Sequence, residues 1–341
     1  MMQNILFTCA GRRNYLINYF KDALNGQGKV FATDQSVTAP AMVDADIAIK
    51  VPGIYANDYI KTLIAIIEEH KITAVISLND LELPILSGNK AVIEATGAQL
   101  IVSDEQVINS ASDKWETFKF IEQLGLNSPK SYIALEKSLE AIKNGDIQFP
   151  LVLKPRWGSA SFGIYFPQNE TELKLAYKLQ QLELERSIFN EVSKSDMDHA
   201  ILIQEKLGGI EYGMDVLNDF KGNYRATFAR EKLSMRSGET DKAVSIIDPQ
   251  LEDIGRSIGE NLKHIGNLDC DVFKSNNNYY VLELNPRFGG GYPFSHEAGV
   301  NTAAIYIEWL NNSDDIDRFI NYKEGLSFSK CDRLINITDR S

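Results

Sequence analysis

Side chains that can bind a metal ion alternate along two neighbouring segments in the last third of the chain. Asp269 and Asp271 lie in NLDCDVFK, and Glu283 and Asn285 lie in YYVLELN. If residues 276–278 form a three-residue hairpin loop, Asp271 lies opposite Glu283 and Asp269 lies opposite Asn285. Carboxylates about 5 Å apart repel each other unless a cation lies between them. We therefore predict that Asp271, Glu283 and Asn285 bind Mg²⁺, which prefers carboxylate and amide oxygens.

The metal prediction depends on the length of this loop. Strand alternation places four apolar side chains on the opposite face of the hairpin, namely Cys270, Val272, Leu282 and Leu284. A four-residue loop would shift the register by one residue and place Asp271 and Glu283 on opposite faces. A solvated outer face of a hairpin is the alternative interpretation of the same pattern.

Three cationic side chains occur where they can contact phosphate groups. Lys154 ends an apolar strand and precedes a loop that contains Gly158, Ser159, Ser161 and Gly163. Backbone N–H groups of such a loop can approach an anion closely, although the P-loop pattern is absent. A simple β-hairpin with a lysine at its strand end is the alternative. Arg287 follows the metal segment and can hold a phosphate or carboxylate bidentately.

The third cation, Lys114, lies in the first turn of a predicted helix. We expect Asp113 to cap this helix, with Glu116 completing a capping box. A cation in this turn opposes the helix dipole by roughly 0.3 to 1 kcal/mol, so an anionic partner elsewhere would explain Lys114. An exposed surface lysine is the commoner alternative.

A further polar cluster ends the apolar segment ILIQ at residues 201–204. Glu205 and Lys206 follow it directly, Gly208 and Gly209 turn the chain, and Glu211 begins another strand. A strand end followed by a turn offers free backbone groups to a flat heterocycle, and carboxylates accept hydrogen bonds from amino groups or ribose hydroxyls. A polar connector between domains is an equally good interpretation.

Composition limits the partners that the protein can have. The 341 residues include 35 Lys and Arg against 47 Asp and Glu, a net charge of -12. This acidic balance argues against nucleic acids and membrane surfaces as partners. Any anionic ligand must therefore be held by a local positive cluster.

The three scattered cysteines, the lack of a signal-peptide pattern and the short apolar runs favour a cytoplasmic location.

The elements that must position these groups fall into three predicted units. Apolar strands at 4–10, 29–34, 72–78 and 99–103 alternate with amphipathic helices and predict a doubly wound α/β domain over residues 1–110. Residues 111–204 read as a linking helix and a small α+β unit, with strands at 130–134, 151–154, 164–166 and 200–204 and a helix at 170–185. Residues 205–341 predict an antiparallel sheet covered by helices at 248–264 and 301–311.

In this order, these segments resemble the ATP-grasp superfamily, most closely single-module proteins similar to half of the carbamoyl-phosphate synthase large subunit. The most specific match is ELNPRFGGGYPFSHEAG at residues 283–299. The resemblance implies an ATP-grasp fold with an N-terminal pre-ATP-grasp domain, a lid and a C-terminal grasp domain. Asp271 stands where carbamoyl-phosphate synthase has Gln, and this chain has one module instead of two. Both departures argue against carbamoyl phosphate synthesis.

The resemblance also implies roles for individual residues. Lys114 and Lys154 would contact ATP phosphates, and the loop from Gly158 to Gly163 would close over them. Glu205, Lys206 and Leu207 would line the adenine edge, and Glu211 would hold the ribose. Asp271, Glu283 and Asn285 would carry the magnesium ions, two in number, and Arg287 would stabilise the transferred phosphoryl group or an acyl phosphate.

The function expected from this assignment is an ATP-dependent ligase that joins a small-molecule carboxylate to an amine through an acyl phosphate. A homodimer is a possible assembly. We expect the residues that shape the pocket for the acceptor substrate to be among Arg12, Arg13, Arg230, Arg236, a loop at 238–243, Tyr292, Ser295 and His296. Two alternatives remain: an ATP-binding regulatory or scaffold protein without turnover, and an NAD-dependent oxidoreductase. The latter keeps only Gly11 of the dinucleotide-binding fingerprint.

Overall fold

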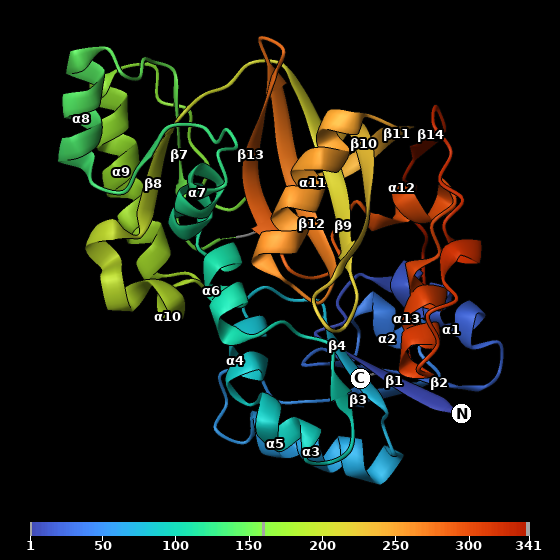
Figure 1. Ribbon diagram of the computed structural model, residues 1–341. Helices are drawn as coiled ribbons and strands as arrows, with labels where there is room; N and C mark the ends of the chain where they lie inside the picture. The colour runs from blue at the N-terminus through green and yellow to red at the C-terminus, as the bar shows by residue number, and fades with distance from the viewer. Residues whose placement is uncertain (1, 159–160, 339–341) are drawn as a thin grey trace.

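The computed structural model describes residues 2–158 and 161–338, and its N-terminal part is a five-stranded parallel sheet. The strand order is β3-β2-β1-β4-β5 (Figure 1). The strands are β1 (Gln3–Thr8), β2 (Gly28–Asp34), β3 (Ile47–Lys50), β4 (Ala74–Ser77) and β5 (Gln99–Leu100). The helices are α1 (Asn14–Leu24), α2 (Pro40–Asp44), α3 (Tyr59–His70), α4 (Leu83–Gly88), α5 (Lys90–Glu94) and α6 (Glu105–Ser112). The predicted doubly wound sheet is confirmed, and the edge strand β3 is an addition to it.

Both faces of this sheet are buried, which explains why its strands are continuous apolar runs. Ile5 and Phe7 pack into one core cluster with α1, while Leu6 between them packs into a second cluster with α3. The first cluster also contains Phe288 and Tyr306 from the end of the chain. The N-terminal sheet is therefore fixed to the C-terminal part by a shared core.

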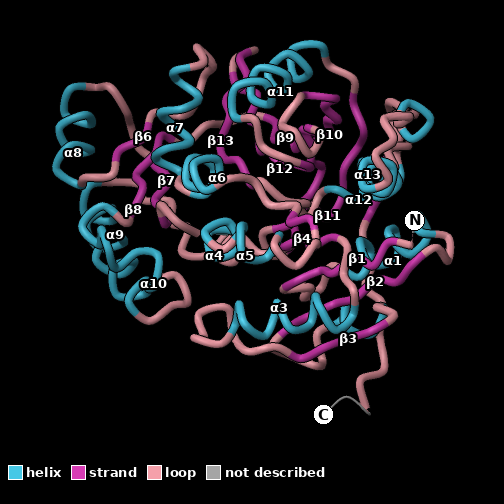
Figure 2. Tube along the Cα trace, turned by 60° about the horizontal axis from the view of Figure 1, so that its bottom comes forward, coloured by secondary structure: helices cyan, strands magenta, loops and turns pink. Residues whose placement is uncertain are grey.

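The lid is a small antiparallel sheet of order β6-β8-β7, flanked by helices. In Figure 2 its strands lie to one side of both other sheets. Its elements are α7 (Lys114–Gln123), β6 (Ser131–Tyr132), α8 (Leu135–Asn144), β7 (Leu151–Pro155), α9 (Glu170–Glu185), α10 (Asn190–Ser193), η1 (Lys194–His199) and β8 (Ile201–Glu205). The predicted strand at 164–166 is a single bridge from Tyr165 to Leu153. The helix α8 was not predicted.

The C-terminal part is a six-stranded antiparallel sheet of order β13-β12-β9-β10-β11-β14. Its elements are β9 (Ile210–Asn218), β10 (Tyr224–Arg236), β11 (Glu239–Ile246), α11 (Pro249–Leu262), β12 (Gly266–Ser275), β13 (Asn278–Asn285), α12 (Tyr292–Glu297), α13 (Thr302–Leu310), η2 (Asp317–Phe319) and β14 (Ser327–Ser329). The loop predicted at 238–243 is wrong, because residues from Glu239 onward pair with β10 as strand β11.

The hairpin of β12 and β13 has the predicted pairing at the site but a different turn. Ser275 pairs with Asn278, so the loop has two residues, Asn276 and Asn277, both with positive φ. The three-residue loop was therefore wrong. The register shifts by one residue between Asp271 and Val272, which restores the predicted partners beyond that point. A β-bulge thus produces the pairing of Asp271 with Glu283 that the three-residue loop was expected to produce.

The bulge also changes which side chains of β13 enter the core. Tyr279, Val281 and Leu284 pack with Cys270 and Val272 in one cluster. Leu282 was expected there and is only half-buried, because the extra residue reverses the alternation along β13. The outcome is that Glu283 keeps its place opposite Asp271.

Candidate active site

Lys114 joins the lid to the C-terminal sheet. It begins α7, and its Nζ lies 3.6 Å from Glu283 Oε2 on β13 and 2.6 Å from the carbonyl oxygen of Gly158, to which it donates a hydrogen bond. Its side chain is 10% exposed. The anionic partner predicted for a lysine in a first helical turn is therefore Glu283.

Asp113 fixes the start of α7 and ties it to the lid. Its carboxylate accepts from the backbone N–H groups of Trp115 and Glu116, which confirms the predicted cap. The Arg156 guanidinium donates to the same carboxylate, with Nε and Nη2 2.7 to 2.9 Å from its oxygens. Glu116 pairs with Lys119 at 2.7 Å. Lys114 is thus held at a helix end that is anchored from both sides.

Lys154 and Glu283 are groups of opposite charge, the first buried and the second half-buried, whose pKa values are both lowered. Burial lowers the pKa of the Lys154 ammonium to about 8, and the neighbouring Lys114 adds to that effect. Burial alone would raise the pKa of Glu283, but Lys114, Lys154 and Lys232 together bring it to about 2. Glu283 is therefore ionised at neutral pH in the middle of a cationic cluster.

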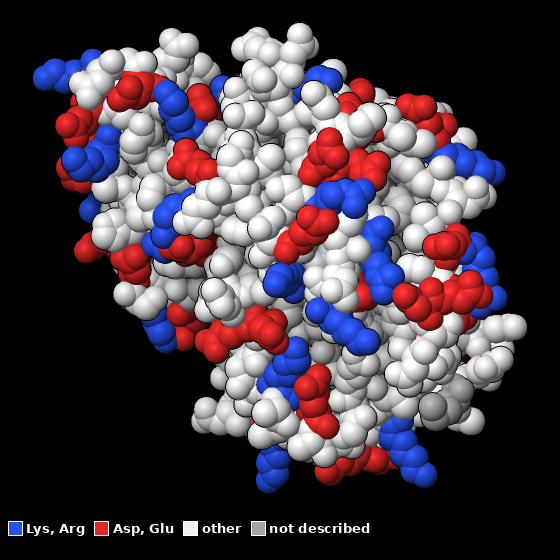
Figure 3. All heavy atoms as spheres, viewed as in Figure 1, with Lys and Arg blue, Asp and Glu red and all other residues white. Residues whose placement is uncertain are grey.

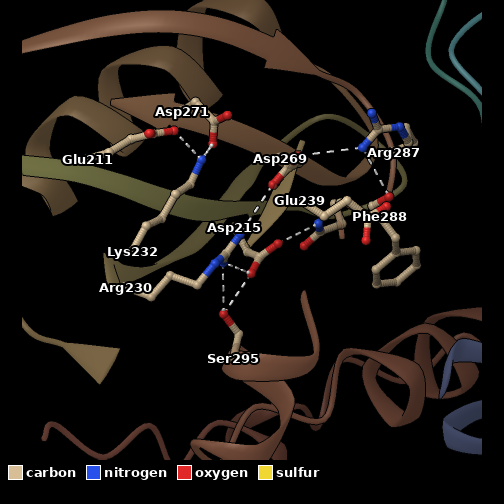
Figure 4. Close-up of polar contacts among 12 residues, drawn as sticks. Glu211, Asp215, Arg230, Lys232, Glu239, Asp269, Asp271, Arg287, Phe288 and Ser295 are labelled. Atoms are coloured by element: carbon tan, nitrogen blue, oxygen red, sulfur yellow. Dashed lines mark hydrogen bonds and ion pairs between the residues drawn. The ribbon is translucent and has the colours of Figure 1, made fainter. Parts of the chain in front are cut away.

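Lys232 on β10 is a member of this cluster that the sequence did not single out. Its Nζ donates to Glu211 Oε1 at 2.6 Å and to Asp271 Oδ1 at 2.7 Å, as Figure 4 shows. Burial raises the pKa of the Asp271 carboxyl although Lys232 opposes it. The lysine holds together a predicted metal ligand and the predicted ribose ligand.

Arg287 is gripped by a carboxylate from the N-terminal sheet. Its Nε and Nη2 donate to the two carboxylate oxygens of Asp80, each at 2.8 Å, and its Nη1 lies 3.5 Å from Asp269. Asp80 follows β4 and was not predicted. A single sequence gives no signal that Asp80 pairs with Arg287, because the two residues are 207 positions apart.

A second arginine continues the same charge network on the sheet face. Arg230 is 1% exposed and pairs with Asp215 at 2.6 Å and Asp269 at 3.2 Å. Ser295 donates to Asp215 at 2.6 Å (Figure 4). Among the predicted acceptor determinants, Arg230 and Ser295 therefore share one buried network.

The run of glycines after Arg287 permits these groups to pack closely. A Cβ at Gly289 would lie 2.1 Å from Asp269 Cγ, and one at Gly291 would lie 2.0 Å from Arg230 Nη2. Real side chains do not approach so closely, so the carboxylate and the guanidinium occupy the space that these glycines leave. This explains the glycines of the segment on which the family resemblance rests.

The predicted metal ligands meet across two adjacent strands. Asp271 pairs with Glu283 and Asp269 with Asn285 in the ladder. Within residues 2–158 and 161–338 no group of three or more His, Cys, Asp or Glu side chains is arranged to hold a metal ion. The predicted set contains two carboxylates and one amide, and lysine ammonium groups contact both carboxylates. Carboxylate and amide oxygens are the hard donors that Mg²⁺ prefers, so the donor types of this set fit Mg²⁺, whereas the two lysine contacts compete with a bound cation.

The predicted adenine and loop residues lie in or beside the lid. Glu205 accepts from the backbone N–H of Lys130 at 2.8 Å, Lys206 Nζ lies 6.0 Å from the ring centre of Phe166, and Leu207 is half-buried. In the glycine-rich loop, Ser161 and Gly163 have positive φ, and Gln180 donates to the carbonyl of Gly163. Ser159 lies outside the described residues.

The remaining predicted acceptor determinants divide between the site and the surface. Arg13 lies 3.3 Å from Glu239 and donates to Tyr15 at 2.8 Å. Arg236 instead forms surface ion pairs with Asp241 and Asp332. Arg13 thus belongs near the network of Arg287, whereas Arg236 does not.

The positive charges of the site are separate from the surface charge. Lys114, Lys154 and Arg287 are each at most 10% exposed. On the face drawn in Figure 3, basic and acidic side chains are interspersed. The cations predicted to hold an anion are therefore buried rather than spread over the surface, and Lys114 and Arg287 are paired with Glu283 and Asp80. No helix of the described ranges is long and apolar enough to cross a membrane.

Comparisons with known proteins find two family models that match separate parts of the chain. Residues 5–101 match the family model "PylC-like, N-terminal domain", and residues 197–333 match "ATP-grasp in the biosynthetic pathway with Ter operon". Over 257 residues the chain is 26% identical to the carbamoyl phosphate synthase large chain of Campylobacter jejuni, covering 72% of this chain and 22% of that protein. The chain therefore spans about a fifth of the length of this relative.

Solved structures show the same fold at low identity. Biotin carboxylase from Campylobacter jejuni superimposes with a TM-score of 0.71 at 15% identity, covering 95% of this chain and 72% of that one. An L-amino acid ligase from Bacillus licheniformis also gives a TM-score of 0.71, at 17% identity, covering 95% and 79% of the two chains. These likenesses extend over the N-terminal sheet, the lid and the C-terminal sheet together.

Proposed function

The chain belongs to the ATP-grasp superfamily, and from that premise we propose that it is an ATP-dependent ligase that joins a small-molecule carboxylate to an amine. The reaction passes through an acyl phosphate and releases ADP and phosphate. The observation that carries the proposal is the position of Glu283, an ionised and partly exposed carboxylate among Lys114, Lys154 and Lys232. Such a cluster suits phosphoryl transfer, which needs positioning and charge neutralisation more than a covalent nucleophile.

In the first step, a substrate carboxylate oxygen attacks the γ-phosphorus of ATP. The bond from this phosphorus to the bridging oxygen breaks, and ADP leaves with the electron pair. Lys114 and Lys154 stabilise the negative charge on the phosphoryl oxygens, and the loop from Gly158 to Gly163 excludes water above them. Arg287, kept in place by Asp80, stabilises the acyl phosphate.

In the second step, the nitrogen of a neutral amine attacks the acyl carbon. A C–N bond forms, the C–O bond to phosphate breaks, and the nitrogen loses one proton as phosphate departs. No side chain acts as a covalent nucleophile in this scheme. The chain supplies orientation, and holding the two substrates in reacting geometry accounts for most of the rate increase.

Mg²⁺ would be held by Asp271, Glu283 and Asn285, with two ions as the proposed number, and would neutralise charge on the phosphoryl oxygens. Lys232 keeps the Asp271 carboxylate in place for that purpose. We further propose that Glu211 binds the ribose, that Glu205, Lys206 and Leu207 line the adenine edge, and that Ser159 and Ser161 contribute to the phosphate loop.

An ADP-release screen tests this proposal. The full chain is incubated with Mg-ATP and pairs of carboxylates (amino acids, uronic acids, nucleotide sugars) and amines, with Glu283→Ala as the inactive control. We expect ADP to accumulate only when both substrates are present, and the control to release none. ATP binding by calorimetry with no ADP release from any pair would instead favour the regulatory or scaffold protein.

A further inference from the structure

A cavity of about 250 Å³ lies where the N-terminal sheet, the lid and β13 meet. One end is formed by Lys114, Gly158, Glu283 and Asn285, which belong to the proposed phosphoryl-transfer site. The walls are mostly apolar and include Tyr55, Leu81, Ile85, Trp157, Phe189 and Val192. The cavity therefore connects the reacting centre to an apolar space that ATP and Mg²⁺ do not need.

The charges that line this cavity favour a cation over an anion. Asp80, Glu191 and Glu283 contribute carboxylates, whereas Lys114 is the one cation among the described lining residues. Lys114 is already engaged by Glu283 and by the carbonyl of Gly158. The carboxylates are paired as well, Asp80 with Arg287, Glu191 with Lys194 and Glu283 with Lys114, but a carboxylate oxygen can accept further hydrogen bonds. An amine would therefore find acceptors here, whereas a further carboxylate would meet three groups of its own charge.

The walls come from two elements that face each other across the cavity. Ile85 lies in α4 of the N-terminal part, and Leu81 lies just before that helix. Val192 lies in α10 of the lid, and Phe189 lies just before that helix. Ile85 packs against an apolar cluster of the N-terminal part, whereas Leu81, Phe189 and Val192 pack in the apolar cluster of the lid, so the walls are supported from behind. A ligand between them would bury its own apolar surface, at roughly 25 cal/mol per Å².

We propose that this cavity binds the amine substrate and that this amine carries an apolar or aromatic carbon frame. The inference rests on the proposed function. The nitrogen points to the end formed by Glu283 and Asn285, where the acyl phosphate forms. The carbon frame lies between Ile85 and Val192. The volume suits one ring or one branched chain and excludes larger polar amines.

The test compares three small probes that separate charge from apolar frame. Calorimetry of the full chain, saturated with a non-hydrolysable Mg-ATP analogue, measures binding of 2-phenylethylamine, phenylacetate and ethylamine. We expect 2-phenylethylamine to bind at least about tenfold more tightly than the other two. Equal or tighter binding of phenylacetate, equal binding of ethylamine, or no binding of 2-phenylethylamine would overturn the proposal.

Substitutions locate the binding. Ile85→Trp should fill the cavity and weaken 2-phenylethylamine binding by about tenfold or more, while affinity for the ATP analogue stays unchanged. Val192→Trp, on the lid side of the cavity, should weaken 2-phenylethylamine binding by a similar factor. It replaces Ile85→Trp as the test if Ile85→Trp does not fold. The matched control is Val92→Trp on α5, where the valine is 50% exposed and outside the cavity. Normal amine binding by folded Ile85→Trp and Val192→Trp would contradict the assignment.

The two proposals can fail separately. Tight 2-phenylethylamine binding without ADP release from any carboxylate would refute the ligase proposal and keep the cavity assignment. ADP release that requires a polar amine and does not occur with 2-phenylethylamine would refute the cavity assignment and leave the ligase proposal standing.

Discussion

Two glutamates, Glu283 and Glu82, show how the surroundings of a carboxyl group decide its use. Glu283 lies among three lysines, which lower its pKa to about 2. Glu82 is fully buried below the N-terminal sheet's carboxyl edge, and burial raises its pKa, although hydroxyl donors such as Ser77 and Thr8 oppose the shift. The lysines favour the ionised form of the first carboxyl, and burial favours the protonated form of the second.

The difference is a matter of which elements meet. Glu283 lies where a helix start, a lid strand and a sheet face bring ammonium groups together. Glu82 lies inside one unit, where its partners are neutral hydroxyls, including that of Tyr59. A site for a polyanion needs the first arrangement, and a stable α/β core tolerates the second.

The largest effect should come from removing the charge of Glu283. Glu283→Gln keeps the shape but leaves the lysines without their anion and removes a proposed metal ligand. ADP release should fall about a thousandfold while the protein stays folded by circular dichroism. Turnover within a few fold of the wild type would contradict the role of this carboxylate.

The next effect concerns the protonation of Lys154. Because its pKa is lowered to about 8, the ammonium that would bind phosphate is lost as the pH rises through that value. The Kd for Mg-ATP should rise by up to about tenfold per pH unit above about pH 8. Calorimetry from about pH 7 to about pH 10 checks this. Lys154→Met should bind ATP weakly at every pH, and a pH slope that survives in it would assign the titration to another group.

A smaller effect is expected from substituting Asp80, whose carboxylate accepts two hydrogen bonds from Arg287. Asp80→Asn removes one charge and the bidentate geometry, so Arg287 is less well oriented. We expect kcat to fall by about tenfold with little change in KM for ATP. Asp104→Asn is the matched control, since Asp104 pairs with Lys90 at an exposed site. Equal effects of the two substitutions would argue against a positioning role for Asp80.

The smallest effect should follow from Glu82→Gln, which replaces a buried acid, whose pKa burial raises, by a neutral amide. Activity should be unchanged, and the free energy of unfolding at low pH should change by less than about 1 kcal/mol. Because the folded pKa of Glu82 is raised, wild-type stability falls as the pH rises from the unfolded pKa toward the folded one. The variant lacks this loss, so its stability relative to wild type should increase over that range. Urea denaturation at several pH values measures it.

The sequence predicted those parts of the site that lie close together along the chain. Asp271, Glu283 and Asn285 were found because strand alternation and one turn relate them, even though the turn was wrong and a bulge corrected the register. The cap of Asp113 was found because it is local.

The remainder depended on contacts between distant segments. Asp80 reaches Arg287 across 207 positions, and Lys232 reaches Asp271 from another strand. Lysine and aspartate on exposed strands or loops look the same in a sequence whether they face solvent or a partner. The strand β11 was mistaken for a loop because its polar residues lack an apolar alternation. The three-unit division at residues 110 and 204 stays a prediction.

The central claim is that ATP activates a carboxylate as an acyl phosphate at the Glu283 cluster. The most direct measurement uses a carboxylate labelled with ¹⁸O in both oxygens, together with the amine identified by the ADP-release screen. Mass spectrometry of the released phosphate should show one ¹⁸O atom per turnover, because the bridging oxygen leaves with phosphorus when the amine attacks carbon. Unlabelled phosphate, formed at the same rate as the amide, would contradict the account.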